Sequence, residues 1–188
     1  MTPFPDTSVQ IDSHTLQGAT GVLTIDLDAL AANWRALESR AVPAECSAVV
    51  KADAYGCGIM PVTRKLASIG CKTFFVATLD EAKLAREAAP KAAIYVLDGF
   101  FANCGDDFAK IDCRPVIGDL NELAEWDAFR RTRGWTGLAA LHIDTGMNRL
   151  GLTVDEARGL TPRIRQADHG IALVMSHLAC AEDMTNAM

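Results

Sequence analysis

The feature that most constrains the fold of this chain is a repeated alternation of short apolar runs and amphipathic segments. Each run is three to five residues of mainly apolar and β-branched type, which is typical of a buried strand, and a helical pattern separates it from the next run. Single helices between short buried strands indicate right-handed βαβ units and a parallel sheet. The predicted strands are Cys46–Val50, Thr73–Ala77, Ala93–Leu97, Arg114–Val116, Ala139–Ile143 and Ala172–Met175.

The number of strands bears on the kind of parallel sheet. A TIM-type barrel needs eight strands and about 250 residues, and this chain has 188. We therefore predict an α/β fold, a TIM-type (β/α)8 barrel with about six of its eight strands, over residues 21–188. Residues 1–20, rich in Pro, Ser, Thr and Gly, are expected to be an unstructured lead. Periodicity alone also allows a doubly wound open sheet, although no G-x-G-x-x-G phosphate loop is present.

Local signals predict where the helices begin and end. Apolar residues at helical spacing predict a first helix over Asp28–Arg40. Pro61 fits the first turn of a helix, and Pro90 is expected to stop one. Gly159 and Pro162 are expected to interrupt the last predicted helix. Capping pairs are expected at Thr78 with Glu81, Asp119 with Glu122 and Thr153 with Glu156.

Composition excludes several classes of function. The formal charge of −6 and the lack of a basic stripe argue against a nucleic-acid surface. No apolar stretch approaches the length of a membrane span, and the first twenty residues contain no apolar signal-peptide core. The six cysteines form no C-x-x-C pair and the histidines have no zinc-ligand spacing, so we expect reduced thiols and no metal site. A cytoplasmic protein without a membrane partner is the expectation.

A lysine, Lys51, follows the first predicted strand directly. In a barrel, the carboxyl ends of the strands form the catalytic face. An amine at an apolar rim is partly desolvated, which favours the neutral, nucleophilic form that a Schiff base with an aldehyde cofactor requires. Tyr55, four residues later, offers a phenol to a phosphate or a developing charge. The alternative is that Lys51 only ends a strand and extends to solvent.

Two later loops place further polar residues after strands. Arg149 lies in a glycine-bracketed loop after the fifth predicted strand and has the planar fork that holds a carboxylate. Asp144 in the same loop either orients a neighbour or is an ordinary loop acid. His177 follows the sixth strand and is suited to stack on a ring, or else is a structural histidine. A lysine, an arginine and a histidine after different strands of one barrel are typical of an active site of this fold.

These same segments resemble the motifs of the alanine racemase family. Val49–Gly56 (VVKADAYG) resembles the cofactor-lysine motif, and His142–Gly151 (HIDTGMNRLG) is similar to the second motif. Ser176–Ala179, followed by Glu182 and Asp183, is similar to the third. The resemblance extends from about residue 22 to the end of the chain.

The resemblance implies a pyridoxal 5′-phosphate enzyme that interconverts L- and D-alanine and so supplies D-alanine for peptidoglycan. It implies that Lys51 binds the cofactor covalently and moves the α-proton on one face of the substrate. Tyr55 is then expected to contact the cofactor phosphate, and Arg149 the cofactor and the substrate carboxylate. His177 and Leu97 are expected to line the cofactor pocket. A homodimer with a shared active site is also implied.

The sequence departs from the family pattern at two positions and in length. His142 stands where many members have a lysine that supports the arginine, and Cys57 stands where a histidine is usual. Members of the family continue through two more strands into a β-rich C-terminal domain, which is missing here. We therefore expect the 188 residues alone to be inactive and prone to aggregate. The alternatives are a non-catalytic cofactor-binding barrel and an inactive truncated remnant.

Overall fold

A computed structural model of the chain describes residues 20–181, 183 and 185. Its centre is a sheet of six strands, all of them parallel to their neighbours. The strands are β1 (Ala48–Val49), β2 (Thr73–Val76), β3 (Ala93–Val96), β4 (Arg114–Ile117), β5 (Ala139–His142) and β6 (Ile171–Met175). All six strands expected from the sequence are present, and β1 is shorter than its apolar run.

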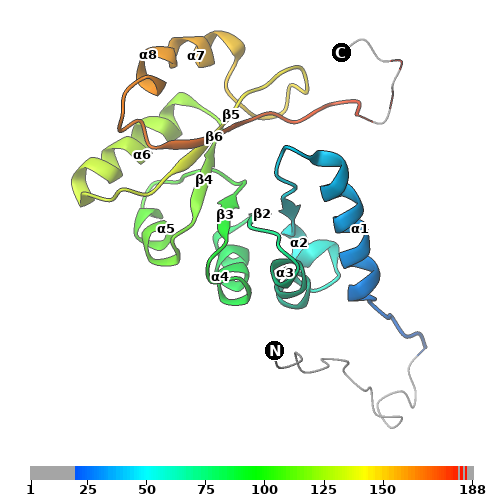
Figure 1. Cartoon of the computed structure of the whole chain (residues 1–188). Coiled ribbons are helices and arrows are strands. Elements are labelled where there is room, and N and C mark those ends of the chain that lie inside the picture. The colour runs from blue at the N-terminus through cyan, green and yellow to red at the C-terminus, as the bar shows by residue number, and fades with distance from the viewer. Residues whose placement is uncertain (1–19, 182, 184, 186–188) are drawn as a thin grey trace.

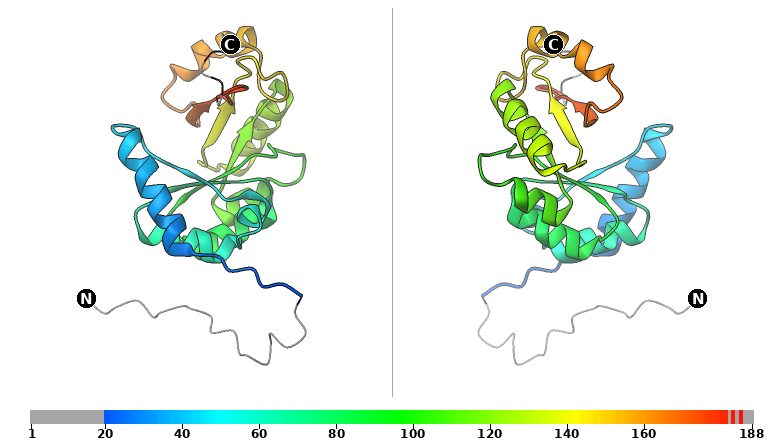
Figure 2. Two further views of the ribbon diagram at one scale, coloured as in Figure 1. Left: turned by 90° about the vertical axis from the view of Figure 1, so that its right-hand side faces the viewer. Right: turned by 90° about the vertical axis from the view of Figure 1, so that its left-hand side faces the viewer.

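The strands follow one another in the sheet in the order β1-β2-β3-β4-β5-β6. In a doubly wound sheet the strand order reverses at one point, so that consecutive strands are not all neighbours. The sequential order found here therefore distinguishes a barrel from a doubly wound sheet. The sheet curls and its helices lie around it, as Figures 1 and 2 show. The predicted TIM-type barrel with six of its strands is confirmed. Among the described strands, β1 and β6 are the two edges.

Seven right-handed helices cover the outer face of the sheet, while α2 (Lys51–Tyr55) has an unusual backbone described below. The seven are α1 (Leu27–Ala41), α3 (Ile59–Ser68), α4 (Leu79–Ala88), α5 (Gly105–Ile111), α6 (Leu120–Arg133), α7 (Val154–Gly159) and α8 (Thr161–Ile164). Pro61 lies in the first turn of α3, and α4 ends two residues before Pro90, as predicted. The interruption expected after Thr153 is also observed, because α7 and α8 are separate short helices.

The three predicted capping residues all accept hydrogen bonds from the first turns of their helices. The Thr78 hydroxyl accepts from Glu81 N, and the Asp119 carboxylate accepts from Asn121 N and Glu122 N. Only the Thr153 cap is a reciprocal capping box. The carboxylates of Glu81 and Glu122 instead accept from the backbone N–H one residue before the cap, so two of the three pairs differ from the expected geometry.

Alternation along the strands divides the apolar residues into two clusters. The larger cluster lies between the sheet and the helices and contains Phe74, Ile94 and Trp126, all fully buried. The smaller cluster lies on the inner face of the curled sheet and is built from Phe75, Tyr95, Val116 and Ala140. Since successive side chains of a strand point to opposite faces, the strands from β2 to β6 each contribute to both clusters, and β1 contributes Ala48 to the outer one.

The remaining expectations about the chain concern its ends and its thiols. The predicted lead falls almost entirely on residues 1–19, which lie outside the described residues. Within the part of the chain that the structure describes, no helix is long and apolar enough to cross a membrane. The six cysteines have free thiols. Burial raises the pKa of Cys71 to about 11 and that of Cys113 to about 12, so these two thiols act as small apolar side chains.

Candidate active site

The sequence-predicted site residues lie at the carboxyl ends of strands, along one rim of the sheet. Lys51 follows β1, Leu97 follows β3, and His177 follows β6 with one residue between. Arg149 lies in the loop after β5. Because the strands are all parallel, their carboxyl ends share one edge of the curled sheet, which is where barrels of this kind place their chemistry.

A main-chain hydrogen bond at the end of β1, made by the residue before Lys51, holds Lys51 at this rim. Val50, the residue before it, is buried in the outer core, and its N–H donates to the Phe75 carbonyl oxygen at 2.8 Å. The Lys51 side chain is half-buried. Among the described residues its Nζ atom has no ion pair and no hydrogen bond. A half-buried amine without a partner is available to react.

The segment after Lys51 is a left-handed turn. Ala52, Asp53, Ala54 and Tyr55 have φ angles of 53°, 53°, 52° and 55°. This conformation costs an L-residue roughly 1–2 kcal/mol, so four in succession require support from elsewhere. Gly56, at φ 82°, ends the turn, and its N–H donates to the carbonyls of Ala52 and Asp53 at 3.0 and 3.1 Å.

The turn determines how Lys51 and Tyr55 are presented. Ala54 is buried and anchors the turn in the outer core. Tyr55 is 65% exposed, and its hydroxyl has no hydrogen bond to any described residue. Within the part of the chain that the structure describes, an amine and a phenol without partners thus lie on one short turn.

The loop that carries Arg149 is organised by Asp144. The Asp144 carboxylate accepts hydrogen bonds from Gly146 N at 2.9 Å and Asn148 N at 3.0 Å, and these bonds lower its pKa. The loop then returns along β5, where Leu152 N donates to the His142 carbonyl and Asp144 N donates to the Leu152 carbonyl, both at 2.8 Å. Asp144 is therefore bonded to main-chain N–H groups of its own loop.

Arg149 is exposed at the tip of this loop. Among the described residues its guanidinium has no ion pair and no hydrogen bond. It lies close enough to His142 for its charge to lower the pKa of that imidazole. The arginine is therefore a free cation beside the end of β5.

His142 and His177 lie close together at the ends of β5 and β6. Burial is the main cause that lowers the pKa of His142, and the nearby His177 and Arg149 lower it further. The two strand ends are also joined by a hydrogen bond between the Thr145 and Ser176 hydroxyls at 2.5 Å. His177 is exposed, and its Nδ1 is 2.8 Å from the Leu178 carbonyl oxygen. The structure thus brings Arg149, His142 and His177 together.

Leu97 follows β3, which lies in the sheet between β1, the strand before Lys51, and the strands β5 and β6 that precede Arg149 and His177. It is half-buried and packs against the inner cluster. No described side-chain contact joins Lys51 or Tyr55 directly to Arg149 or His177, since β1 and β6 are opposite edges of the open sheet. The site therefore has two parts, one after β1 and the other after β5 and β6, with Leu97 between them.

The floor of the inner face contains a polar group that the sequence analysis did not single out. Arg114, the first residue of β4, donates to the Tyr95 hydroxyl at 2.8 Å, and its guanidinium lies 5.3 Å from the centroid of that ring. The Tyr95 ring stacks on Phe75 at 5.0 Å. The sequence signal that could have revealed this group is an arginine at the start of an otherwise apolar strand. Arg114 is two residues from Val116, so both side chains point to the inner face of the sheet.

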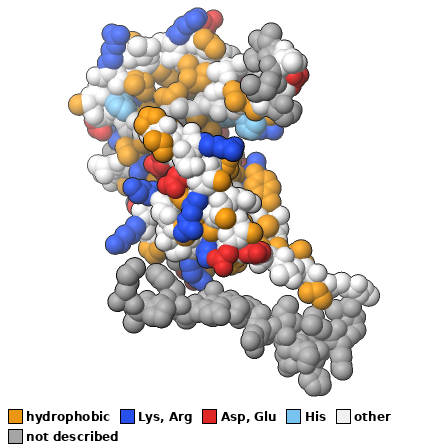
Figure 3. All heavy atoms as spheres, turned by 45° about the vertical axis from the view of Figure 1, so that its right-hand side comes forward, with side chains coloured by type: hydrophobic (Ala, Val, Ile, Leu, Met, Phe, Trp, Pro, Cys, Tyr) orange, Lys and Arg blue, Asp and Glu red, His pale blue; other side chains and the backbone are white. Residues whose placement is uncertain are grey.

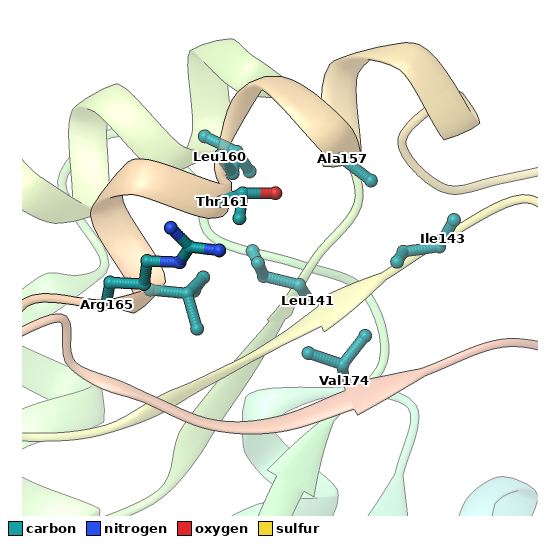
Figure 4. A pocket seen from close by; sticks show the side chains of 8 residues that line it. Leu141, Ile143, Ala157, Leu160, Thr161, Arg165 and Val174 are labelled. Atoms are coloured by element: carbon teal, nitrogen blue, oxygen red, sulfur yellow. The ribbon is translucent and has the colours of Figure 1, made fainter.

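An apolar pocket on the opposite face is separate from this site. Figure 4 shows Leu141 and Ile143 of the β5 segment and Val174 of β6 facing Leu160 and Thr161 at the junction of α7 and α8. Leu141 belongs to the outer core, so the pocket lies on the helix side of the sheet. None of the predicted site residues lines it.

Figure 3 shows one face of the molecular surface. Histidine and hydrophobic side chains lie on the upper part of this face, with charged side chains of both signs above and below them. No cluster of three or more potential metal ligands is found among the described residues. The candidate chemistry therefore rests on the lysine, the phenol, the guanidinium and the imidazoles.

Together, the fold and the site define a class: a (β/α)-barrel protein with a half-buried lysine at the end of its first strand and a cation and imidazoles at the ends of later strands. The family model for the N-terminal domain of alanine racemase matches residues 25–188. The chain belongs to the alanine racemase family, as its motifs suggested.

Individual relatives agree with this assignment. An alanine racemase of Methylobacterium sp. strain 4-46 is 52% identical over 160 residues, which are 85% of this chain and 44% of the relative. A catabolic alanine racemase of Agrobacterium fabrum is 45% identical over 168 residues, which are 88% of this chain and 43% of the relative. The chain thus spans less than half the length of these curated relatives.

The fold is similar to that of solved alanine racemases. The crystal structure of the enzyme from Bartonella henselae, described with covalently bound pyridoxal phosphate, superimposes with a TM-score of 0.80 at 34% identity. The match covers 87% of this chain and 48% of that structure. The expected fold and family are confirmed.

Proposed function

We propose that this chain is the part of a pyridoxal-phosphate-dependent alanine racemase that holds the cofactor lysine. The observation that carries the proposal is Lys51, an unpartnered amine at the carboxyl end of β1, on a rigid turn that also carries Tyr55. The family assignment supports it, because relatives at 45–52% identity are named alanine racemase. The substrate is accordingly alanine.

The residues present fit the cofactor. Its aldehyde needs a free amine, its phosphate needs hydrogen-bond donors, and its phenolic oxygen or a substrate carboxylate needs a cation. Lys51, Tyr55 and Arg149 are such groups, and within the described residues none of their polar side-chain ends has a partner. When bound, the cofactor supplies an electron sink for negative charge at the substrate Cα.

Each site residue then has a role of its own. Lys51 Nζ binds the cofactor and moves the α-proton on one face of the substrate. Tyr55 would donate a hydrogen bond from its hydroxyl group to the phosphate, and Arg149 would bind the substrate carboxylate through its planar fork. His177 and Leu97 line the pocket and keep water from the ring. Burial lowers the pKa of His142, which favours its neutral form over a second positive charge beside Arg149.

Racemisation needs a second proton-transfer group, because one base returns the proton to the face from which it took it. We propose that this group comes from outside the present chain, in a site shared by the two subunits of a homodimer. We further propose a cytoplasmic location and a role in supplying D-alanine for peptidoglycan. These proposals rest on the family alone.

The test is cofactor trapping in the complete natural protein that carries this chain. The protein is incubated with pyridoxal phosphate, reduced with borohydride and mapped by mass spectrometry, and conversion of L-alanine to D-alanine is assayed in parallel. We expect the label on Lys51, its loss in Lys51→Arg, and retention in Lys72→Arg. Lys72 is a matched control, because it is an exposed lysine at the opposite end of the strands, directly before β2.

Two outcomes would contradict the proposal. A folded protein that is not labelled at Lys51 would remove the cofactor assignment. Labelling at Lys51 without racemisation would instead indicate a cofactor-binding barrel that does not catalyse the reaction.

A further inference from the structure

The left-handed turn after Lys51 is bonded to a residue of another βα unit. Asp53, the second strained residue of the turn, donates its N–H to Glu81 Oε1 at 3.2 Å. The other carboxylate oxygen, Oε2, accepts from Ala77 N at 2.8 Å. Glu81 is half-buried in the first turn of α4. One carboxylate thus joins the segment after β1 to the segment after β2.

The Asp53 side chain continues this connection on the other side. Its Oδ1 accepts from Ile59 N, the first residue of α3, at 2.7 Å. The strained turn is therefore fixed at one residue from two directions, by α4 through the main chain and by α3 through the side chain. Local bonds to Gly56 and Gly58 complete it. Support of this kind is what four left-handed L-residues need in order to persist.

A second glutamate in the same molecule provides an internal comparison. Glu122 occupies the same position in α6, and its Oε2 accepts from Gly118 N at 2.8 Å. Its carboxylate also reaches the loop after β3, where it lies against Gly99. Each of the two carboxylates thus connects the loop before its own helix to the loop after the preceding strand. Only Glu81 touches the segment that carries Lys51.

We propose that Glu81 is a positioning residue that fixes Lys51 and Tyr55 relative to each other by holding the Asp53 N–H. This inference rests on the proposed function, since it concerns the presentation of the cofactor lysine. A carboxylate suits the role because both of its partners are donors. In Glu81→Gln the amide oxygen accepts one of these bonds, and the amide NH2 faces the other N–H donor. Loss of one of the two hydrogen bonds leaves the strained turn free to relax.

The experiment compares Glu81→Gln with Glu122→Gln in the complete natural protein. Three quantities are measured: the dissociation constant for pyridoxal phosphate, the yield of borohydride-trapped label on Lys51, and hydrogen exchange of the amides of residues 53–57 without cofactor. For Glu81→Gln we expect cofactor binding weakened about tenfold or more, as for loss of a hydrogen bond to a charged group. We also expect a lower label yield and faster exchange of these amides.

Glu122→Gln separates positioning from general stability. It should lower the melting temperature by a similar amount, with cofactor affinity and exchange in residues 53–57 unchanged. If both variants weaken cofactor binding equally, the effect is one of stability and the proposal is wrong. Should Glu81→Gln fold poorly, Ala52→Gly is added, because glycine adopts φ near 53° without strain. The double variant should recover folding and part of the cofactor affinity.

Failure of this inference is distinguishable from failure of the proposed function. Exchange without cofactor reports on the turn alone. If Glu81→Gln exchanges the Asp53 amide as slowly as the parent protein, the positioning role is wrong whatever the protein does with pyridoxal phosphate. If exchange is faster in the variant but the parent protein is never labelled at Lys51, Glu81 holds the turn and the cofactor assignment is wrong.

Discussion

At the scale of single residues, the site depends on which polar groups the fold leaves free and which it uses for support. The carboxylates of Asp144 and Glu81 both accept hydrogen bonds from main-chain N–H groups. The amine of Lys51 and the guanidinium of Arg149 have no partner among the described residues. The acids of this rim therefore act on the backbone, while the bases stay available to a ligand. Such a division suits a site that binds an anionic cofactor and a carboxylate substrate.

His142 gives a residue-scale prediction about pH. Its pKa is lowered from 6.5 in the fold, mainly by burial, so the unfolded chain binds more protons than the folded chain below that pH. The contribution of His142 to the free energy of unfolding is therefore full above pH 6.5 and is lost as the pH falls through its lowered pKa. His142→Gln should show a weaker decline in stability over this interval, measured by urea unfolding at several pH values. Parallel curves for the two proteins would contradict the assignment.

At the scale of elements, the loop between β5 and α7 shows how a strand end becomes a binding loop. The chain leaves β5, turns around the Asp144 carboxylate and pairs back beside the strand through Leu152. Gly151 makes this return possible. Its φ is +113°, and a Cβ there would lie 2.7 Å from Asp144 N. The position of Arg149 thus depends on a glycine two residues away.

We expect Gly151→Ala to destabilise the loop by about 1–3 kcal/mol, the cost of a strained backbone conformation. Gly159→Ala is the matched control, because a Cβ at Gly159 meets no atom within 4 Å and its φ is outside the left-handed region. Thermal and urea unfolding should show a loss only for Gly151→Ala and a neutral or small stabilising effect for Gly159→Ala. Equal stability of the two variants would mean that the loop does not need its glycine.

At the scale of the whole molecule, the open sheet is the dominant feature. Each edge strand, β1 or β6, pairs with one described neighbour only. Apolar side chains of β6 are also uncovered, since Val174 is 53% exposed. Unpaired strand edges with apolar side chains are templates for association with other chains. The inner cluster is likewise only partly enclosed, because Leu173 and Met175 are half-buried.

We expect the 188-residue chain by itself to associate as its concentration rises, and to do so less when a lysine is placed on β6. Val174→Lys introduces a charge on the edge strand, which discourages strand pairing. Val154→Lys is the control, because Val154 is 44% exposed but lies on α7, away from the edge. Sedimentation velocity over a range of concentrations measures the effect. A monomer with one cooperative melting transition would contradict this expectation.

The sequence by itself determined the elements and their faces. Local apolar periodicity predicted six strands and their parallel pairing, and Lys51 at a strand end predicted the rim on which the site lies. These features depend on neighbouring residues, so a single sequence records them. The shared motifs identified the family for the same reason, because each is a short continuous segment.

Only the tertiary structure decided how these pieces are held. The left-handed turn after Lys51 has no glycine among its four residues, so no local signal predicted it. Its bond to Glu81 joins residues 28 positions apart, and the bond from Arg114 to Tyr95 depends on the register of β3 and β4. The sequential strand order also had to be seen, since periodicity does not distinguish a barrel from a doubly wound sheet. The physical reason is that local pattern sets which face a side chain occupies, whereas sheet curvature and register set which distant groups meet.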